Sequence, residues 1–231
     1  MLQSSSAVIQ ALHSGLIVSC QAPIDSPLHQ PTIIAAIAQA AVNQGAVGVR
    51  IDTPAHIHAV RQQVSVPIIG LWKQVITGFS VSITPQFQHA QAIAEAGADI
   101  IAIDATQRER PGGETVPHLV EQIHTQLGKP VMADIDTLEA AIAAEVAGAD
   151  CISTTLYGYT AQTHNQPPPG LDLLRQIVEE LRVPVICEGG ISAPAMAQEA
   201  LKRGAYAVVV GTDITGIDWK TKAYQAVFPT A

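Results

Sequence analysis

Short apolar runs recur along this chain and alternate with longer stretches of helical character. Each run holds at least four residues and is rich in Ile, Val and Ala, a pattern typical of parallel strands that are buried on both faces. The runs lie at 16–20, 45–50, 67–71, 97–104, 130–134, 148–154, 184–188 and 204–211. The pattern therefore predicts eight short strands.

The runs begin in two different ways. Four of them open on a Gly-Ala step, at Gly45, Gly97, Gly148 and Gly204, and three open on a proline. Glycine at such a step is expected in the left-handed conformation that ends the preceding helix. Proline stops a helix and favours an extended chain before it. The alternation indicates a unit of two strand–helix pairs that is used four times.

Between the runs, apolar residues recur at the spacing of an amphipathic helix. The predicted helices span 33–43, 86–96, 137–147, 171–181 and 193–203, with a short N-terminal helix at about 5–13 and a final helix that contains Lys220 and Lys222. Thr137 and Ser192 are candidate N-caps, and Pro194 fits the first turn of its helix. Helices thus occupy most of the intervals between strands.

Eight strands that alternate with helices predict an α/β fold, a (βα)8 TIM barrel that forms a single domain over residues 1–231. The main alternative is a doubly wound open sheet. No G-x-G-x-x-G motif follows the first strand, as it would in a dinucleotide-binding sheet of that kind. Eight is also the number of strands that closes this barrel, so we favour the barrel.

Composition and charge narrow the classes of partner. Charged residues make up only 14% of the chain and hydrophobic residues 48%, which excludes a disordered chain. The 12 Lys and Arg against 20 Asp and Glu give a net charge of −8, which argues against a nucleic-acid partner. Any anionic substrate must then be held by a few well-placed cations and by backbone N–H groups.

No segment predicts export or a membrane span. Residues 1–12 lack the basic and apolar regions of a signal peptide, and no apolar stretch approaches 18 residues. Cys20, Cys151 and Cys187 each lie in an apolar run, so we expect buried free thiols and a cytoplasmic location. The eight histidines show no metal-ligand spacing, and no metal site is predicted.

Polar side chains follow the predicted strands where the active site of a (βα)8 barrel is built, at the C-terminal ends of the strands. In chain order these are Gln21, Arg50, Lys73, Asp104, Asp134, Thr154 with Thr155, Glu188, and Gly211 with Thr212; Arg108 and Arg110 map to the same face. One or two polar loop residues would be expected there by chance. A lysine, an arginine, two aspartates and a glutamate together indicate a functional site.

Lys73 and Glu188 follow strands 3 and 7, which face each other across an eight-stranded barrel. A lysine in a partly desolvated site can act as a general base or form a Schiff base, and an opposing carboxylate can act as its acid or base partner. A plain ion pair between the two is the alternative. Lys73 is the only lysine that the pattern places at this end of the barrel.

Two glycine-containing loops predict a phosphate site. Gly189 and Gly190 follow strand 7, and Gly211 and Thr212 follow strand 8, which are the loops that bind phosphate in many barrels of this kind. Residues 154–160 place two tyrosines around a glycine and lead into the Pro-rich segment 167–170. This loop either covers a bound sugar or packs on the surface.

Several segments together resemble the N-acetylmannosamine-6-phosphate 2-epimerase family. They are residues 16–22, 45–50, 83–85, 102–106, 132–135, 154–160 and 188–189, and the likeness runs from about 16 to 214. The resemblance implies inversion at C2 between N-acyl-D-mannosamine 6-phosphate and N-acyl-D-glucosamine 6-phosphate, in amino-sugar (sialic acid) catabolism. It further implies a homodimer and neither a metal nor an organic cofactor.

The resemblance also implies roles for individual residues. Lys73 would exchange the C2 proton, and Glu188 would move protons at O1 and O5 during ring opening. The expected substrate contacts are Gln21, Arg50, Asp104, Asp134, Thr155 and Tyr157, and the expected phosphate contacts are Gly189, Gly190, Gly211 and Thr212.

Three positions depart from the family's common pattern. Gln74 stands where many relatives have a second basic residue, Gly190 where many have arginine, and Pro23 where leucine is common. The resemblance therefore does not imply that a guanidinium group of the loop after strand 7 contacts the phosphate. Two other functions remain open on the same barrel: a Schiff-base phosphosugar lyase or aldolase that uses Lys73, and a noncatalytic phosphosugar-binding module.

Overall fold

Eight parallel strands close into a barrel in the order of the sequence, with the last strand paired to the first. The computed structural model describes residues 7–229. The strands are β1 (Leu16–Cys20), β2 (Gly48–Asp52), β3 (Ile68–Leu71), β4 (Ile100–Asp104), β5 (Val131–Asp134), β6 (Cys151–Ser153), β7 (Val185–Glu188) and β8 (Ala207–Val210). The predicted (βα)8 barrel is confirmed, and the open sheet is excluded.

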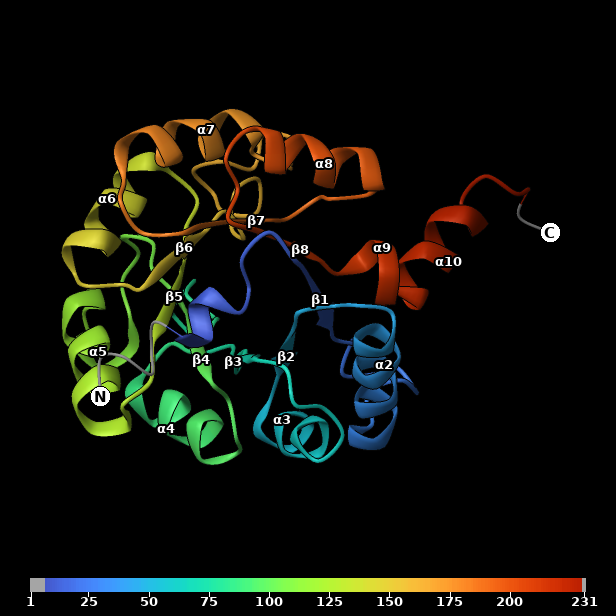
Figure 1. The fold of residues 1–231 in the computed structure, drawn as a ribbon, viewed down its shortest axis with the longest axis horizontal. Coiled ribbons are helices and arrows are strands. Elements are labelled where there is room, and N and C mark those ends of the chain that lie inside the picture. The colour runs from blue at the N-terminus through green and yellow to red at the C-terminus, as the bar shows by residue number, and fades with distance from the viewer. Residues whose placement is uncertain (1–6, 230–231) are drawn as a thin grey trace.

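Helices surround the barrel (Figure 1). They are α2 (Pro31–Asn43), α3 (Pro54–Arg61), α4 (Phe87–Glu95), α5 (Val116–Gln122), α6 (Leu138–Val146), α7 (Leu171–Glu180), α8 (Pro194–Lys202), α9 (Thr212–Thr215) and α10 (Ile217–Gln225), with a 3-10 turn η1 (Pro111–Gly113) and a π-helical turn η2 (Ile123–Leu127). No helix within residues 7–229 is both long enough and apolar enough to cross a membrane.

Local sequence explains most helix boundaries. The four glycines of the Gly-Ala steps have φ between 94° and 109°, as predicted for the residue that ends a helix. Thr137 caps α6 by accepting a hydrogen bond from the N–H of Ala140 at 3.2 Å. The cap predicted at Ser192 is wrong, because Ala193 is the N-cap of α8 and Ser192 Oγ instead donates to Met196 Sδ at 3.2 Å. Pro194 does lie in the first turn of that helix.

The sequence pattern did not predict three of the helices, α3, α5 and α9. They have eight, seven and four residues, too few for a repeating apolar stripe. Of the N-terminal helix predicted at 5–13, residues 5 and 6 lie outside the described part, and residues 7–10 are helical.

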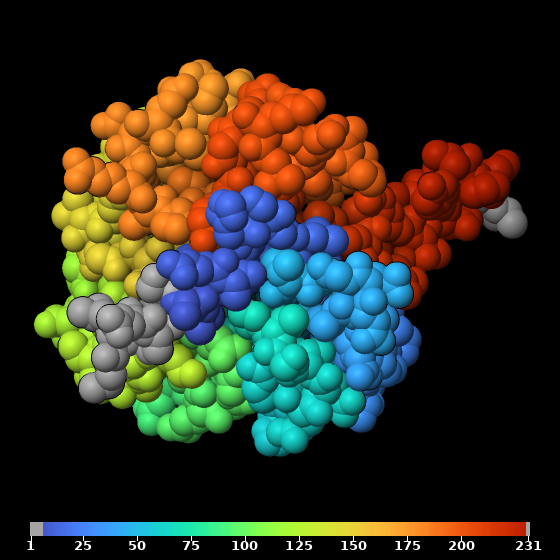
Figure 2. All heavy atoms as spheres, in the orientation of Figure 1, coloured from blue at the N-terminus to red at the C-terminus, as the bar shows by residue number. Residues whose placement is uncertain are grey.

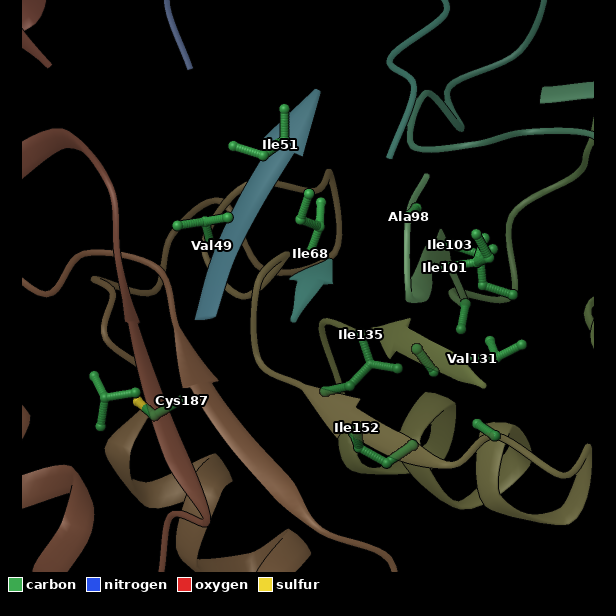
Figure 3. Close-up of a cluster of buried hydrophobic side chains, with 14 of the residues drawn as sticks. Val49, Ile51, Ile68, Ala98, Ile101, Ile103, Val131, Ile135, Ile152 and Cys187 are labelled. Atoms are coloured by element: carbon green, nitrogen blue, oxygen red, sulfur yellow. The ribbon is translucent and has the colours of Figure 1, made fainter. Parts of the chain in front are cut away.

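The core has two layers because successive strand residues point to opposite sides of the sheet. Ile17 and Ile100 lie inside the barrel, whereas their neighbours Val18 and Ile101 lie in the layer between barrel and helices. Figure 3 shows part of that outer layer, where side chains of β2 to β7 meet the helices. The three cysteines are buried free thiols, as predicted.

The N-terminal segment covers the end of the barrel at which the strands begin (Figures 1 and 2). Leu12 is fully buried there and packs against Gly48 at the start of β2. The opposite end, where the strands finish, is left open to solvent and holds the candidate site.

Candidate active site

A cavity of about 990 Å³ opens at the C-terminal ends of β1, β2, β3, β7 and β8. Eight of the twelve residues predicted for the site line it: Gln21, Lys73, Thr155, Glu188, Gly189, Gly190, Gly211 and Thr212. The other four, Arg50, Asp104, Asp134 and Tyr157, do not line it.

Lys73 lies just beyond β3 and is fixed through its backbone. Its N–H donates to Asp52 Oδ1 at 3.0 Å, and the residue forms an antiparallel bridge with Ile83. Its Nζ donates to Gln21 Oε1 at 2.5 Å, and Gln21 Nε2 donates in turn to Ser19 Oγ at 2.9 Å. No carboxylate of the described residues lies within 4.0 Å of Nζ. The plain ion pair between Lys73 and Glu188 is therefore not formed, and the side-chain nitrogen of Lys73 faces the cavity with the neutral Gln21 as its partner.

Glu188 ends β7 on another wall of the cavity. Its side chain is about 12% exposed, and its Oε2 lies 3.0 Å from Arg50 Nη1 and accepts a hydrogen bond from Thr155 Oγ1 at 3.0 Å. Burial raises the pKa of Glu188, against the lowering effect of Arg50, while nearby Asp134 raises it further. This carboxyl group is therefore suited to hold a proton and to release it.

Arg50 and Asp134 form a buried ion pair beneath the cavity. Arg50 Nη1 donates to Oδ1 at 3.0 Å and Nη2 to Oδ2 at 2.5 Å, while Thr155 Oγ1 lies 2.8 Å from Oδ1. Arg50 is 1% exposed and Asp134 fully buried. Both were predicted as substrate contacts, but the structure places them behind Glu188 and Thr155, where they set the charge around Glu188.

Asp104 is held by its own loop. Its carboxylate accepts hydrogen bonds from Thr106 Oγ1 at 2.7 Å and from Arg108 Nη2 at 2.5 Å. Arg108 and Arg110 line a second cavity of about 650 Å³ that also includes residues of α5 and α6. The structure thus separates Asp104 and these two arginines from the cavity that holds Lys73.

Tyr157 is not among the residues that line the cavity, whereas Tyr159 is. The hydroxyl of Tyr157 donates to Gln166 Oε1 at 2.5 Å, and its ring packs on Gly170. Tyr159 is 61% exposed at the rim, and burial of its hydroxyl together with the charge of Glu188 raises its pKa. The loop after β6 therefore contributes its second tyrosine, where the prediction had named the first.

The loops after β7 and β8 present backbone N–H groups. Gly189 and Gly190 have φ of 101° and 68°, and Gly190 lies directly against Pro168. Within residues 7–229, no group accepts a hydrogen bond from the N–H of Gly189, Gly190, Gly211 or Thr212. Several unpaired donors that converge from adjacent loops can bind an anion.

The cavity also contains residues that the sequence did not single out: His29, Asp52, Trp72, Asp213, Trp219 and Lys220. Asp52 could have been predicted as a site residue from its position at the end of a strand, because β2 continues two residues past Arg50. The expectation that Lys73 is the only lysine at this end is wrong, because Lys220 of α10 also lines the cavity. No sequence pattern indicated this, since α10 follows a turn whose direction is set by packing.

A metal site has no support in the described part of the chain, where no three His, Cys, Asp or Glu side chains are grouped to hold an ion. The polar groups of the cavity can bind an anion through N–H donors and can exchange protons through an amine and a carboxyl group.

Comparison with known proteins gives consistent matches. A family model described as "Putative N-acetylmannosamine-6-phosphate epimerase" matches residues 34–228. A protein of Thermosynechococcus vestitus, described as "Putative N-acetylmannosamine-6-phosphate 2-epimerase", is 63% identical over 215 residues, which are 93% of each chain. A protein of Synechococcus elongatus with the same description is 59% identical over 218 residues, or 94% of each chain.

A solved structure agrees with these matches. The N-acetylmannosamine-6-phosphate 2-epimerase from Clostridium perfringens is 39% identical and superposes with a TM-score of 0.91, covering 95% of this chain and 96% of its own. A thiamine phosphate pyrophosphorylase from Pyrococcus furiosus, at 18% identity and a TM-score of 0.60, shares the fold.

Proposed function

Because the chain belongs to the N-acetylmannosamine-6-phosphate epimerase family, we propose that it is an isomerase that converts N-acyl-D-mannosamine 6-phosphate into N-acyl-D-glucosamine 6-phosphate by proton transfer at C2. One observation carries the proposal for the site: Lys73 and Glu188, from strands four apart in the closed barrel, line a single cavity without pairing to each other.

The reaction needs a base next to the aldehyde of the open-chain sugar. The hydrogen at C2 becomes acidic when C1 is a carbonyl, and the amine of Lys73 takes it while the electron pair moves toward O1. C2 is then planar. The gluco epimer forms when the C1–C2 unit turns about the C2–C3 bond and the protonated Lys73 returns the proton to the opposite face of C2, while the electron pair moves back from O1. Gln21, which has no charge of its own, holds the Lys73 amine in place through its side-chain oxygen.

Glu188 is proposed to move protons at O1 and O5. Opening the ring requires a proton for O5 and removal of one from O1, and closing it requires the reverse. A carboxyl group with a raised pKa can do both. Thr155 and Arg50 hold its Oε2, so its position relative to the sugar is fixed before substrate binds.

The phosphate is proposed to bind at the loops after β7 and β8. The unpaired N–H groups of Gly189, Gly190, Gly211 and Thr212 support this, since all four residues line the same cavity as Gln21 and Lys73. Backbone donors add no net charge, which fits a chain with few cations.

The remaining partner assignments are also proposals. We expect neither a nucleic-acid partner nor a cofactor, and a cytoplasmic enzyme of amino-sugar catabolism. A homodimer is supported by α10, which projects from the barrel (Figures 1 and 2) and has no buried residue. Trp219, Tyr224, Val227 and Phe228 are each at least 58% exposed along this segment, an apolar surface that a second copy would cover.

The test is incubation with N-acetylmannosamine 6-phosphate in D2O, followed by proton NMR. We expect the C2 hydrogen to exchange as the gluco epimer forms, and Lys73→Ala to lose both. Absence of exchange with the wild type, or normal exchange in the variant, would refute the proposal. Borohydride trapping of a covalent adduct would favour the Schiff-base lyase, and phosphosugar binding without turnover would favour the binding module.

A further inference from the structure

Lys220 is a second lysine in the cavity that the proposed chemistry does not use. It lies in the first turn of α10, and its Nζ pairs with the carboxylate of Asp213 in α9. Both side chains line the cavity beside Gly211 and Thr212, where the phosphate is proposed to bind. The lysine side chain is 42% exposed, so it is free to reach a bound anion.

The charges around the cavity indicate that a bound phosphate needs a nearby cation. Its ionisable acidic and basic residues other than histidine are Asp52, Lys73, Glu188, Asp213 and Lys220, which include more carboxylates than ammonium groups. A phosphate monoester adds a charge of about −1.5 to −2. Gly190 supplies no side chain, and Lys73 Nζ already donates to Gln21 Oε1. Of the cavity's lining residues, Lys220 is the remaining lysine.

The position of Lys220 is determined by the fold. Gly216 joins α9 to α10 in a turn so tight that a Cβ there would lie 2.7 Å from the backbone oxygen of Thr212. Thr215 Oγ1 donates to the carbonyl oxygen of Ser19 at 2.8 Å, which fixes the end of α9 on β1. Ser26 Oγ donates to Asp218 Oδ2 at 3.0 Å and ties the start of α10 to the loop after β1. These contacts lie just before Lys220 in the chain and fix the start of the helix that places it in the cavity lining.

We propose that Lys220 is a phosphate-binding residue of this site. Its ammonium group has three donors, so it bridges Asp213 and a phosphate oxygen when the sugar phosphate binds. The neutral backbone N–H groups then orient the phosphate, and the positive charge of Lys220 offsets its negative charge. This proposal rests on the proposed function, because it assigns the phosphate of that substrate to this end of the cavity.

The test compares Lys220→Gln with three variants. Lys222→Gln removes a lysine from the same helix that does not line the cavity. Asp213→Asn breaks the same ion pair but keeps the ammonium group. Lys220→Arg keeps the charge. Each is assayed for KM and kcat with N-acetylmannosamine 6-phosphate and with the unphosphorylated sugar, and for binding of inorganic phosphate by calorimetry.

We expect Lys220→Gln to raise KM for the phosphorylated sugar about tenfold, with kcat within about threefold, and to weaken binding of inorganic phosphate by a similar factor. Slow turnover of the unphosphorylated sugar should not change. Lys222→Gln and Asp213→Asn should not weaken phosphate binding, and Lys220→Arg should restore most of it.

The proposal is overturned if Lys220→Gln weakens phosphate binding no more than Lys222→Gln, or if Asp213→Asn reproduces its effect, since the broken ion pair would then be the cause. Equal loss with the phosphorylated and unphosphorylated sugars would also overturn it. Binding of inorganic phosphate tests Lys220 even if the wild type does not epimerise the sugar, so failure of the proposed function and failure of this proposal are distinguishable.

Discussion

The guanidinium of Arg50 lies 3.0 Å from the carboxylate of Glu188, with Arg50 buried beneath the cavity and Glu188 on its wall. The same guanidinium holds Asp134 through two hydrogen bonds. One buried cation therefore serves two carboxylates. Burial raises the pKa of Glu188 although Arg50 lies beside it and lowers it, and the charge of Asp134 raises that pKa further.

Removal of this cation should destabilise the fold. In Arg50→Met, Asp134 becomes a fully buried carboxylate without a counterion, and loss of one partner of a buried pair costs roughly 3–5 kcal/mol of unfolding free energy. Urea unfolding at pH 7 measures the loss. The double variant with Asp134→Asn should recover part of it. A change below about 1 kcal/mol in Arg50→Met would show that the pair is not important for stability.

The hydroxyl of Thr155 should lower the pKa of Glu188, because it donates to the ionised carboxylate. Thr155→Val is expected to raise that pKa further, and Thr155→Ser to leave it nearly unchanged. Carbon-13 NMR of labelled glutamate side chains follows the titration directly. A Glu188 pKa that falls or stays constant in Thr155→Val would contradict the assigned hydrogen bond.

Lys73 should be essential for the reaction but not for the fold. Lys73→Met keeps the aliphatic part of the side chain and removes the amine, and kcat should fall by roughly 100-fold to 10,000-fold, the usual contribution of a general base. Its side chain is exposed, so the urea midpoint should hardly move. Lys202→Met, at the C-terminal end of α8, is the matched control and should retain full activity.

Gly190 should tolerate no side chain. Its φ is 68°, and a Cβ would lie 2.7 Å from Pro168 Cβ and 2.8 Å from the Pro168 carbonyl carbon. Gly78 also has a positive φ, of 89°, but has nothing within 4 Å of a built Cβ. In both alanine variants the backbone conformation costs about 1–3 kcal/mol of unfolding free energy. Gly190→Ala should lose more than Gly78→Ala, because only its Cβ clashes with Pro168. Equal losses would mean that Pro168 moves away without cost.

His124 should make stability depend on pH. Its Nε2 lies 2.7 Å from Asp150 Oδ2, and that hydrogen bond raises the pKa of His124 in the folded protein above its ordinary value. The folded protein therefore holds this proton more tightly than the unfolded chain. The stabilisation is fully present below the unfolded pKa of about 6.5 and is lost as pH rises through the folded pKa.

The measurement is the difference in melting temperature between wild type and His124→Gln from pH 5.5 to pH 8.5. The difference should be largest at the acid end and should shrink as pH rises. Asp150 keeps its hydrogen bond from the N–H of Val131 at 2.7 Å, so the loop itself stays formed in the variant. A difference that is constant across this range would rule out the linkage.

The strands were predictable because a strand buried on both faces needs a continuous apolar run, and seven of the eight runs open on a glycine or proline with a defined backbone role. The helix α3 could not be predicted, since only Ile57 and Val60 of its eight residues are buried apolar side chains with more than a methyl group. The fold class therefore followed from the sequence, although not every element did.

Strand ends also predicted the general location of the site, but not the depth of each side chain. Asp134 and Glu188 are the last residues of their strands and Arg50 lies two residues before the end of β2, yet Glu188 alone of the three reaches the cavity. When one positive and two negative side chains lie together, the most deeply buried charges form ion pairs, because a buried charge without a partner is costly. Sequence order carries no record of that pairing.

The sequence by itself determined the closed barrel and placed Lys73 and Glu188 at the end of it where the cavity lies, because each of these follows from a local pattern repeated eight times. Tertiary structure alone decided that Arg50 and Asp134 lie beneath the site, that Asp104 pairs within its own loop, and that Lys220 reaches the cavity. These outcomes depend on distances between segments far apart in the chain, where burial and charge pairing select one arrangement among several that the local sequence allows.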